Sequence, residues 1–256
     1  MQGAASGLDW RDADSYAPLL DADRSLFAWE WLRRDANYRA AAVRARSTHS
    51  GPTPPCASAE EFGLLGFEPA HLGVPDARPV WRSDHHPYVL WAEAGGVNAS
   101  SDLFDPDRLR GLVRLVAGHG CDHLLLSDGL RSIRIDGPAG TFSGGPACLR
   151  YRIEGLAAAE APLLTLRRFL ALCGSGRFSR SLHRRGAQAR RWILMLRASD
   201  ALAAGATQRE IAATLLSRSA AEPLWRSRES SIRSQAQRLV RAARNMGAGG
   251  YRCFLR

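Results

Sequence analysis

Residues 205–216 read GATQREIAATLL, and this stretch decides how the C-terminal part of the chain folds. Thr207 and Glu210 stand three positions apart, just before an apolar run. This is the spacing of a capping box, in which two side chains satisfy backbone N–H groups at a helix start. Gly205 can end the preceding helix, because glycine readily adopts the left-handed conformation. The stretch therefore predicts helices over 187–204 and 207–216 joined by a tight turn, as in the first half of a helix-turn-helix.

A longer helix is predicted over residues 227–247, SRESSIRSQAQRLVRAARNMG, which ends at Gly247. With about 100° between successive residues, its apolar side chains gather on one face. That face consists of Ile232, Ala236, Leu239, Val240, Ala243 and Met246. The pattern predicts that this face packs on the rest of the domain.

The polar face of the same helix carries serine, arginine and glutamine and no acidic residue. A solvated face usually mixes both charges, because like charges four residues apart repel. Arginine and glutamine can bond base edges and phosphates. We therefore predict contact with double-stranded DNA, with a merely solvated face as the alternative. The candidate DNA-binding residues are Thr207, Gln208, Arg209, Arg226, Arg228, Ser230, Arg233, Ser234, Gln237, Arg238, Arg241, Arg244 and Arg252.

The connection between the last two predicted helices is longer than usual. A helix-turn-helix joins its helices by a turn of about three or four residues. Here the stretch SRSAAEPLWRSR, about a dozen residues, lies between them. Trp225 is expected to anchor this insert in the core. The motif is therefore predicted to be a variant, with an extra turn or wing.

Charge is distributed unevenly along the chain. All 35 basic residues are arginine, which a GC-rich genome explains, so their position is more informative than their number. Residues 177–256 hold 17 arginines and 4 acidic residues, a net charge of +13. Residues 1–176 hold 18 arginines and 21 acidic residues, a net charge of −3. A basic third on a mildly acidic body is typical of a module that binds a polyanion.

Residues 9–46 predict a small helical unit that is rich in large aromatic side chains, with Asp23 or Ser25 as a helix cap. One interpretation is that these rings pack on the rest of the protein. The other is that they form a docking surface, since so many large rings on a short element need not all be buried. The candidate partner-binding residues are Phe27, Trp29, Trp31 and Tyr38.

The middle of the chain predicts a sheet. Residues 88–154 contain short apolar and alternating runs, with a hairpin across Ser127-Asp128-Gly129 and a further strand over 146–156. Pro106 predicts a helix near 106–120. The fold class is therefore α+β. We expect a small helical N-terminal domain over 1–46, a linker over 47–58, an α+β domain with an antiparallel sheet over 59–156, and a helical helix-turn-helix-like domain over 157–256.

Several kinds of protein are disfavoured by the sequence. No apolar run reaches the length of a membrane span, and the first residues do not resemble a signal peptide, so a cytoplasmic location without a membrane partner is expected. The five cysteines form no CxxC pair, and His85-His86 has no third ligand at metal spacing, so no metal site is predicted. Common catalytic and nucleotide-binding motifs do not occur, and the arginine constellation of a tyrosine recombinase is not recognisable around His183 and Tyr251. We predict no enzyme, no catalytic residue and no cofactor.

Several stretches resemble RovC-like bacterial transcriptional regulators. DWRDADSYAPLLDADRSLFAWEWLRRDANYRA is similar to their small N-terminal domain. HLLLSDG, LRSIRIDGP, TLRRFLAL and the run from RWILMLRASDALAAGATQREIA to SSIRSQAQRLVRAARNMGAGGYR are similar to their DNA-binding domain, also called domain of unknown function 2285. The resemblance implies DNA contact by residues 226–244 and Thr207–Arg209. It leaves Tyr251-Arg252 as either a backbone clamp or a packed tail.

The resemblance further implies a transcriptional activator, either of type VI secretion genes or of the excision and transfer of integrative conjugative elements. It implies homo-oligomers from dimer to hexamer, RNA polymerase as a partner, and control by a small anti-activator protein. Two other functions stay open. The chain could be an adaptor whose basic helix docks an acidic protein, or a DNA-bound recombination accessory factor without catalysis. RNA is disfavoured, because the polar helix face offers no aromatic ring for stacking.

Overall fold

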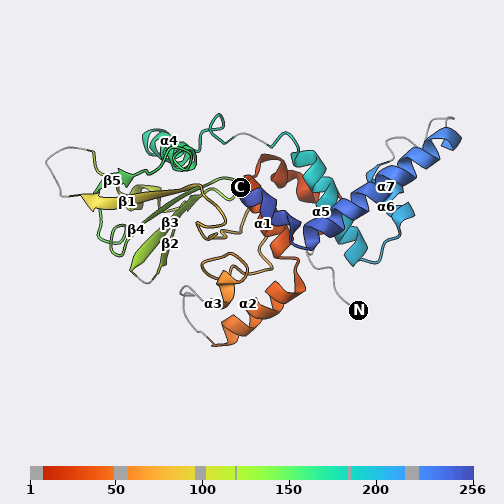
Figure 1. Ribbon diagram of the computed structural model, residues 1–256, viewed down its shortest axis with the longest axis horizontal. Coiled ribbons are helices and arrows are strands. Elements are labelled where there is room, and N and C mark those ends of the chain that lie inside the picture. The colour runs from red at the N-terminus through yellow and green to blue at the C-terminus, as the bar shows by residue number, and fades with distance from the viewer. Residues whose placement is uncertain (1–7, 49–56, 96–101, 119, 184–185, 217–224) are drawn as a thin grey trace.

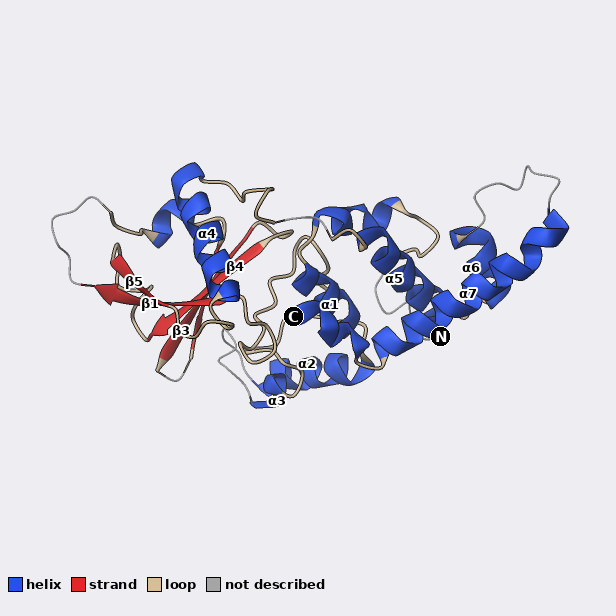
Figure 2. Cartoon of the chain, turned by 45° about the horizontal axis from the view of Figure 1, so that its top comes forward, coloured by secondary structure: helices blue, strands red, loops and turns tan. Residues whose placement is uncertain are grey.

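The computed structural model describes residues 8–48, 57–95, 102–118, 120–183, 186–216 and 225–256, with backbone only for 46–48, 57 and 225–230. Figure 1 shows an elongated chain with a sheet at one end and a group of helices at the other. In Figure 2 the strands and the helices of the two ends are separated by a region of loops. The mixed fold class predicted from the sequence is confirmed.

The sheet has five strands in the order β2-β3-β4-β1-β5. The strands are β1 (Val89–Gly95), β2 (Val113–Ala117), β3 (Cys121–Ser127), β4 (Ser132–Pro138) and β5 (Cys148–Arg152). All neighbours are antiparallel except β1 and β4, which are parallel. The sheet is therefore mainly antiparallel, as expected.

The hairpin predicted across Ser127-Asp128-Gly129 joins β3 to β4, with Ser127 opposite Ser132. The Asp128 carboxylate accepts hydrogen bonds from two backbone N–H groups within the loop. Gly129 has a φ of +92°, and an added Cβ would lie 2.1 Å from the Pro75 carbonyl oxygen. Glycine is required here both by the turn and by the close approach of the loop that carries Pro75.

The prediction of a helix near 106–120 is wrong. Only Pro106–Leu109 is helical, as the single 3₁₀ turn η2, and residues 113–117 form the edge strand β2. Asp105 caps this short turn, and Pro106 follows as its first residue, so the predicted helix start is correct but the helix does not continue. The run VRLVA is too short for its periodicity to separate helix from strand. Pairing with β3 over its whole length decides the matter, because the ladder satisfies the N–H and C=O groups of the segment that face β3.

One face of the sheet is covered by α4 (Glu160–Ser175). Side chains alternate between faces along β3 and β4, so their odd and even positions have different surroundings. The core under α4 includes Leu90, Ala92, Leu124, Leu126, Ile133, Ile135, Phe169 and Leu172. The expected division at residue 157 stays a prediction, but α4 packs with the sheet and not with the later helices.

The N-terminal unit consists of η1 (Asp14–Asp21), α1 (Arg24–Leu32), α2 (Ala36–Thr48) and the short α3 (Ala57–Glu60). Asp23 is the N-cap residue of α1, but its side chain makes no capping bond. A short turn separates α1 from α2, and there the Asp35 carboxylate accepts hydrogen bonds from the N–H groups of Asn37 and Tyr38. The expected linker lies mostly in residues 49–56, outside the described residues.

The aromatic residues predicted to bind a partner belong to the protein core, which corrects the docking interpretation. The most exposed of the four retains only 3% of its accessible surface. The Trp29 indole donates to the Leu72 carbonyl and the Tyr38 hydroxyl donates to the Glu68 carbonyl. The set is Phe27, Trp29, Trp31 and Tyr38. Three of them lie on α1, which packs on several elements at once, including α5, α7 and η3.

The C-terminal helices are α5 (Ala189–Ala203), α6 (Gln208–Leu215) and α7 (Trp225–Gly247), followed by η3 (Gly250–Leu255). Their apolar faces share one continuous core with the N-terminal unit. In Figures 1 and 2, α7 extends past α5 to the end of the molecule opposite the sheet. The helical half of the protein is thus assembled from both ends of the chain.

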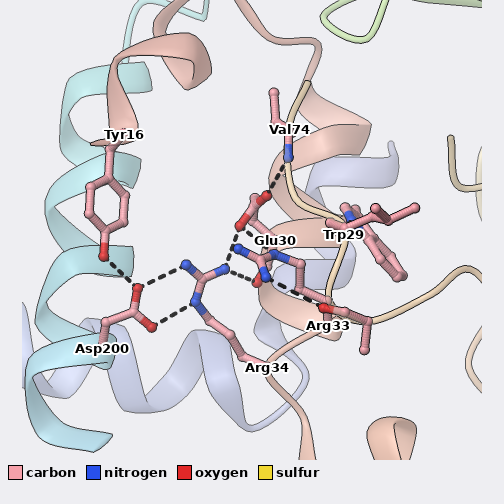
Figure 3. A network of polar contacts seen from close by, with 9 residues as sticks. Tyr16, Trp29, Glu30, Arg33, Arg34, Val74 and Asp200 are labelled. Atoms are coloured by element: carbon pink, nitrogen blue, oxygen red, sulfur yellow. Dashed lines mark hydrogen bonds and ion pairs between the residues drawn. The ribbon is translucent and has the colours of Figure 1, made fainter. Parts of the chain in front are cut away.

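A buried polar network joins α1 to α5 (Figure 3). Asp200 accepts two hydrogen bonds from the Arg34 guanidinium, both 2.8 Å long, and a third of 2.6 Å from the Tyr16 hydroxyl. Arg34 also bonds Glu30 at 2.5 Å, and Glu30 pairs with Arg33 at 2.7 Å. Every charge in the network has an opposite partner, which is what makes ionised groups tolerable in a core.

We expect Asp200→Ala to destabilise the fold by about 3–5 kcal/mol, because it leaves the Arg34 charge buried without its bidentate partner. Denaturant unfolding followed by circular dichroism measures this loss. Asp107→Ala is the matched control, since it removes an ion pair with Arg110 whose side chains are both at least 70% exposed. An equal effect of the two substitutions would contradict the role of the network.

The network also predicts how stability responds to acid. Burial alone would raise the pKa of Glu30, but the charges of Arg34 and Arg33 and the Val74 N–H outweigh it and hold the pKa below 4.5. A lowered folded-state pKa stabilises the fold above the unfolded value and loses that contribution as the pH falls through the folded value. Glu30→Gln should therefore weaken the fold at neutral pH and flatten the decline of stability below about pH 4.5. Unfolding midpoints at several pH values test this, and an unchanged acid slope would contradict it.

Candidate nucleic-acid interface

The start of α6 has the geometry that its sequence predicts. The Thr207 hydroxyl accepts from the Glu210 N–H at 3.3 Å, and the Glu210 carboxylate accepts from the Thr207 N–H at 2.7 Å. Both halves of the capping box are present. Gly205 has a φ of +79° in the turn after α5. The predicted helix–tight turn–helix is confirmed, and α6 contacts both α5 and α7.

The two predicted faces of α7 are also confirmed. Ala236, Val240 and Ala243 are each at most 2% exposed and belong to the side that packs on α5 and α6. Ile232 and Leu239 are half-buried. On the other side, all the described polar candidates are exposed: Arg233, Ser234, Gln237, Arg238, Arg241 and Arg244.

Among the described side chains, the exposed face of α7 has no acidic partner. Among the described residues, none of the arginines at 233, 238, 241 and 244 forms an ion pair. Of the four acidic residues in this basic third, Asp200 serves the core network and Glu210 serves the capping box. These two carboxylates stabilise the fold and do not pair with the arginines of α7, while the side chains of the other two acidic residues, Glu222 and Glu229, lie outside the described residues. A positive, exposed helix face is the electrostatic footprint expected for phosphate contact.

Three candidates on α7 cannot be placed by side chain. Arg226, Arg228 and Ser230 lie on the helix, but their side chains are outside the described residues, as is that of Trp225. The stretch of 217–224 between α6 and α7 also lies outside the described residues.

The candidates at the start of α6 are all exposed, namely Thr207, Gln208 and Arg209. One nearby charge was not predicted. Hydrogen bonds from Thr207 lower the pKa of Glu210, and the charge of Arg11 adds to this effect. Arg11 is exposed and so brings a further positive charge to the start of α6. No pattern in the sequence indicates this proximity, because nearly two hundred residues separate them.

The C-terminal segment is a packed tail on which Arg252 is exposed. Tyr251, Phe254 and Leu255 are buried against the core, and η3 contacts α1. Gly249 has a φ of +104° and allows the chain to turn back after α7. Of the two interpretations of Tyr251-Arg252, the structure places Tyr251 in the packed tail and leaves Arg252 exposed.

Two family models match the chain. The T6SS transcription factor DNA-binding domain of RovC matches residues 154–256, and the proteobacterial transcriptional regulator-like domain matches residues 9–63. The resemblance noted in the sequence is thereby confirmed, and the chain is a RovC-like regulator. Searches of curated proteins and of solved structures returned no match.

The matches identify a DNA-binding transcriptional regulator. The DNA-binding model covers α4 to η3 and therefore includes the exposed face of α7. In the described part of the chain, no group of three or more potential metal ligands occurs, and no helix is both long and apolar enough to cross a membrane.

Thr207→Ala should cost about 1 kcal/mol of stability, because it removes the side chain that caps α6. Thr207→Ser is the control, since serine keeps the hydroxyl and should leave the unfolding midpoint close to that of the original protein. Thermal unfolding of the two variants measures the difference. Equal midpoints would show that the capping box contributes nothing to the stability of this turn.

Proposed function

We propose that the protein binds specific promoter DNA by placing the exposed face of α7 in the major groove and that it activates transcription from there. The observation that carries this proposal is the uncompensated polar face of α7, with Arg233, Gln237 and Arg241 exposed and unpaired among the described residues. Arginine can bond guanine and glutamine can bond adenine in the major groove. The α5–turn–α6 unit supports α7 as the scaffold of a helix-turn-helix variant.

The proposal extends to the genes and partners that the resemblance implies. The name of the matched DNA-binding model supports type VI secretion genes as targets. Genes for the excision and transfer of an integrative conjugative element are the second class of targets. Activation would require contact with RNA polymerase. A homo-oligomer, from dimer to hexamer, would present several α7 helices to repeated half-sites. A small anti-activator protein would act by occupying one of these surfaces. The function needs no catalysis by the chain.

Substitutions on α7 test the proposed DNA contact. Arg233→Ala or Gln237→Ala should cost about 1–3 kcal/mol on the specific site and relax its sequence preference, if those side chains contact bases. Arg241→Ala should weaken binding to all sequences and lower the salt dependence by about one counterion, if that side chain contacts phosphate. Fluorescence anisotropy on DNA from upstream of the protein's own and neighbouring operons, with a scrambled competitor and a salt series, measures both effects.

Arg108→Ala is the matched control for these variants. Its side chain is 81% exposed and belongs to η2, which directly precedes the edge strand β2, far along the chain from α7. The control should bind DNA like the original protein. If all three α7 variants bind as the control does, α7 is not the recognition helix. If the original protein shows no sequence preference but captures an acidic protein through α7, the adaptor function replaces the proposed one. A reporter gene under the bound promoter separates activation from repression.

A further inference from the structure

A small cavity lies on the face of the sheet opposite α4. Its walls come from the start of α1, from the loop 77–88 and from β3 and β4. The lining residues include Ser25 from α1, Tyr88 from the loop, and Ser132 and Arg134 from β4. The cavity has a volume of about 20 Å³ and opens to solvent. Since roughly 10–15 Å³ is enough for one water molecule, the cavity can hold a group of that size or slightly larger.

Two buried donors that line this cavity lack an acceptor. Arg134 and Trp81 are each 4% exposed. The Arg134 Nη1 atom and the Trp81 Nε1 atom have no hydrogen-bond partner in the described part of the chain. Buried N–H groups are nearly always bonded, and each one left without an acceptor costs on the order of 1–3 kcal/mol. Two such donors at one cavity indicate that an acceptor belongs there.

The electrostatic character of the cavity favours a negative acceptor. Its lining contains two arginines, Arg78 and Arg134, and no carboxylate. Asp136 holds two nitrogens of Arg134 in a bidentate pair with distances of 2.8 Å, which leaves the third nitrogen, Nη1, for another acceptor. Desolvation lowers the pKa of His86 to about 4, and the charge of Arg134 lowers it in the same direction. His86 is therefore neutral at neutral pH and does not compete with Arg134 for an anion.

The start of α1 also lines the cavity, and the carboxylate of its N-cap residue Asp23 is engaged by the Ser132 N–H and by His183. Ser25 is the second residue of the nine-residue helix α1, and it lines the cavity. The first turn of a helix has N–H groups without intrahelical acceptors and carries a partial positive charge. Hydroxyl groups of Ser25, Ser127 and Ser132 complete the polar lining. The Ser127 hydroxyl already accepts from the Gly129 N–H, so it can still donate its own proton.

From these features we infer that the cavity is a binding site for a small molecule that presents a carboxylate or phosphate group. The anionic group lies against Arg134 Nη1 and Trp81 Nε1, and the rest of the ligand extends toward the solvent onto which the cavity opens. Because the walls belong both to α1 and to the sheet, a bound ligand touches the two halves of the protein. The inference does not depend on the proposed function of α7.

Indole N–H resonances of the full-length protein test this site. Trp81 is assigned in a ¹⁵N–¹H correlation spectrum by its disappearance in Trp81→Phe. Acetate and inorganic phosphate are then titrated separately in a fixed background of sodium chloride. We expect the Trp81 resonance to shift in a saturable way with at least one of the two, and the one that saturates at lower concentration identifies the preferred group.

The same spectra contain an internal control. The Trp91 indole already donates to Glu93 at 2.9 Å, so its resonance should not shift. Arg134→Lys keeps a charge beside Asp136 but lacks the third guanidinium nitrogen, so it should bind at least about tenfold more weakly. Ser25→Ala is the second variant if the first does not fold, and it should also weaken binding. A Trp81 resonance that does not shift, that shifts linearly without saturation, or that responds equally in these variants would overturn the inference and leave a water molecule as the occupant.

Discussion

The ion pair between Arg34 and Asp200 is the contact on which the helical half of the protein depends. Arg34 lies in the turn just after α1 and Asp200 lies in α5, 166 residues further along the chain, and both side chains are only 6% exposed. Removing charges from water is costly, so they are stable only when every partner is in place. Sliding α1 along α5 would leave a charge unpaired in the core. The pair therefore holds the N-terminal unit and the DNA-binding helices in one relative position.

The same network explains the charge pattern of the surface. The basic third of the chain contains few acidic residues, and the two whose side chains the structure describes, Asp200 and Glu210, both serve the fold. Arg197 is also used internally, since it is buried and donates to the carbonyls of Trp10 and Arg11. The arginines on the outer face of α7 have no such internal role among the described residues. Asp200 and Arg197, which stabilise the fold, thus lie on the buried face of α5, and the arginines available to DNA lie on the outer face of α7.

The sequence predicted correctly those elements whose determining residues lie within a few positions of one another. The capping box at Thr207, the glycine turn at Gly205 and the two faces of α7 are each encoded within a few residues, and all are confirmed. The Asp-Gly hairpin between β3 and β4 is also encoded locally. Segment 113–117 is not encoded locally, because a short apolar run becomes a strand only when β3 lies beside it. The aromatic set of α1 was open to two interpretations for a similar reason, since burial depends on what packs against a ring.

The sequence by itself determined the α+β class, the helices of the C-terminal third with their apolar and polar faces, and the resemblance to RovC-like regulators. These follow from periodicity, capping and charge, which act over a few turns of the chain. Only the tertiary structure decided that α1 is a core helix, that α4 belongs to the sheet, and that Arg134 and Trp81 line one cavity. Each of these depends on contacts between segments that are distant in sequence, and a buried partner or an unsatisfied donor exists only once those segments have been brought together.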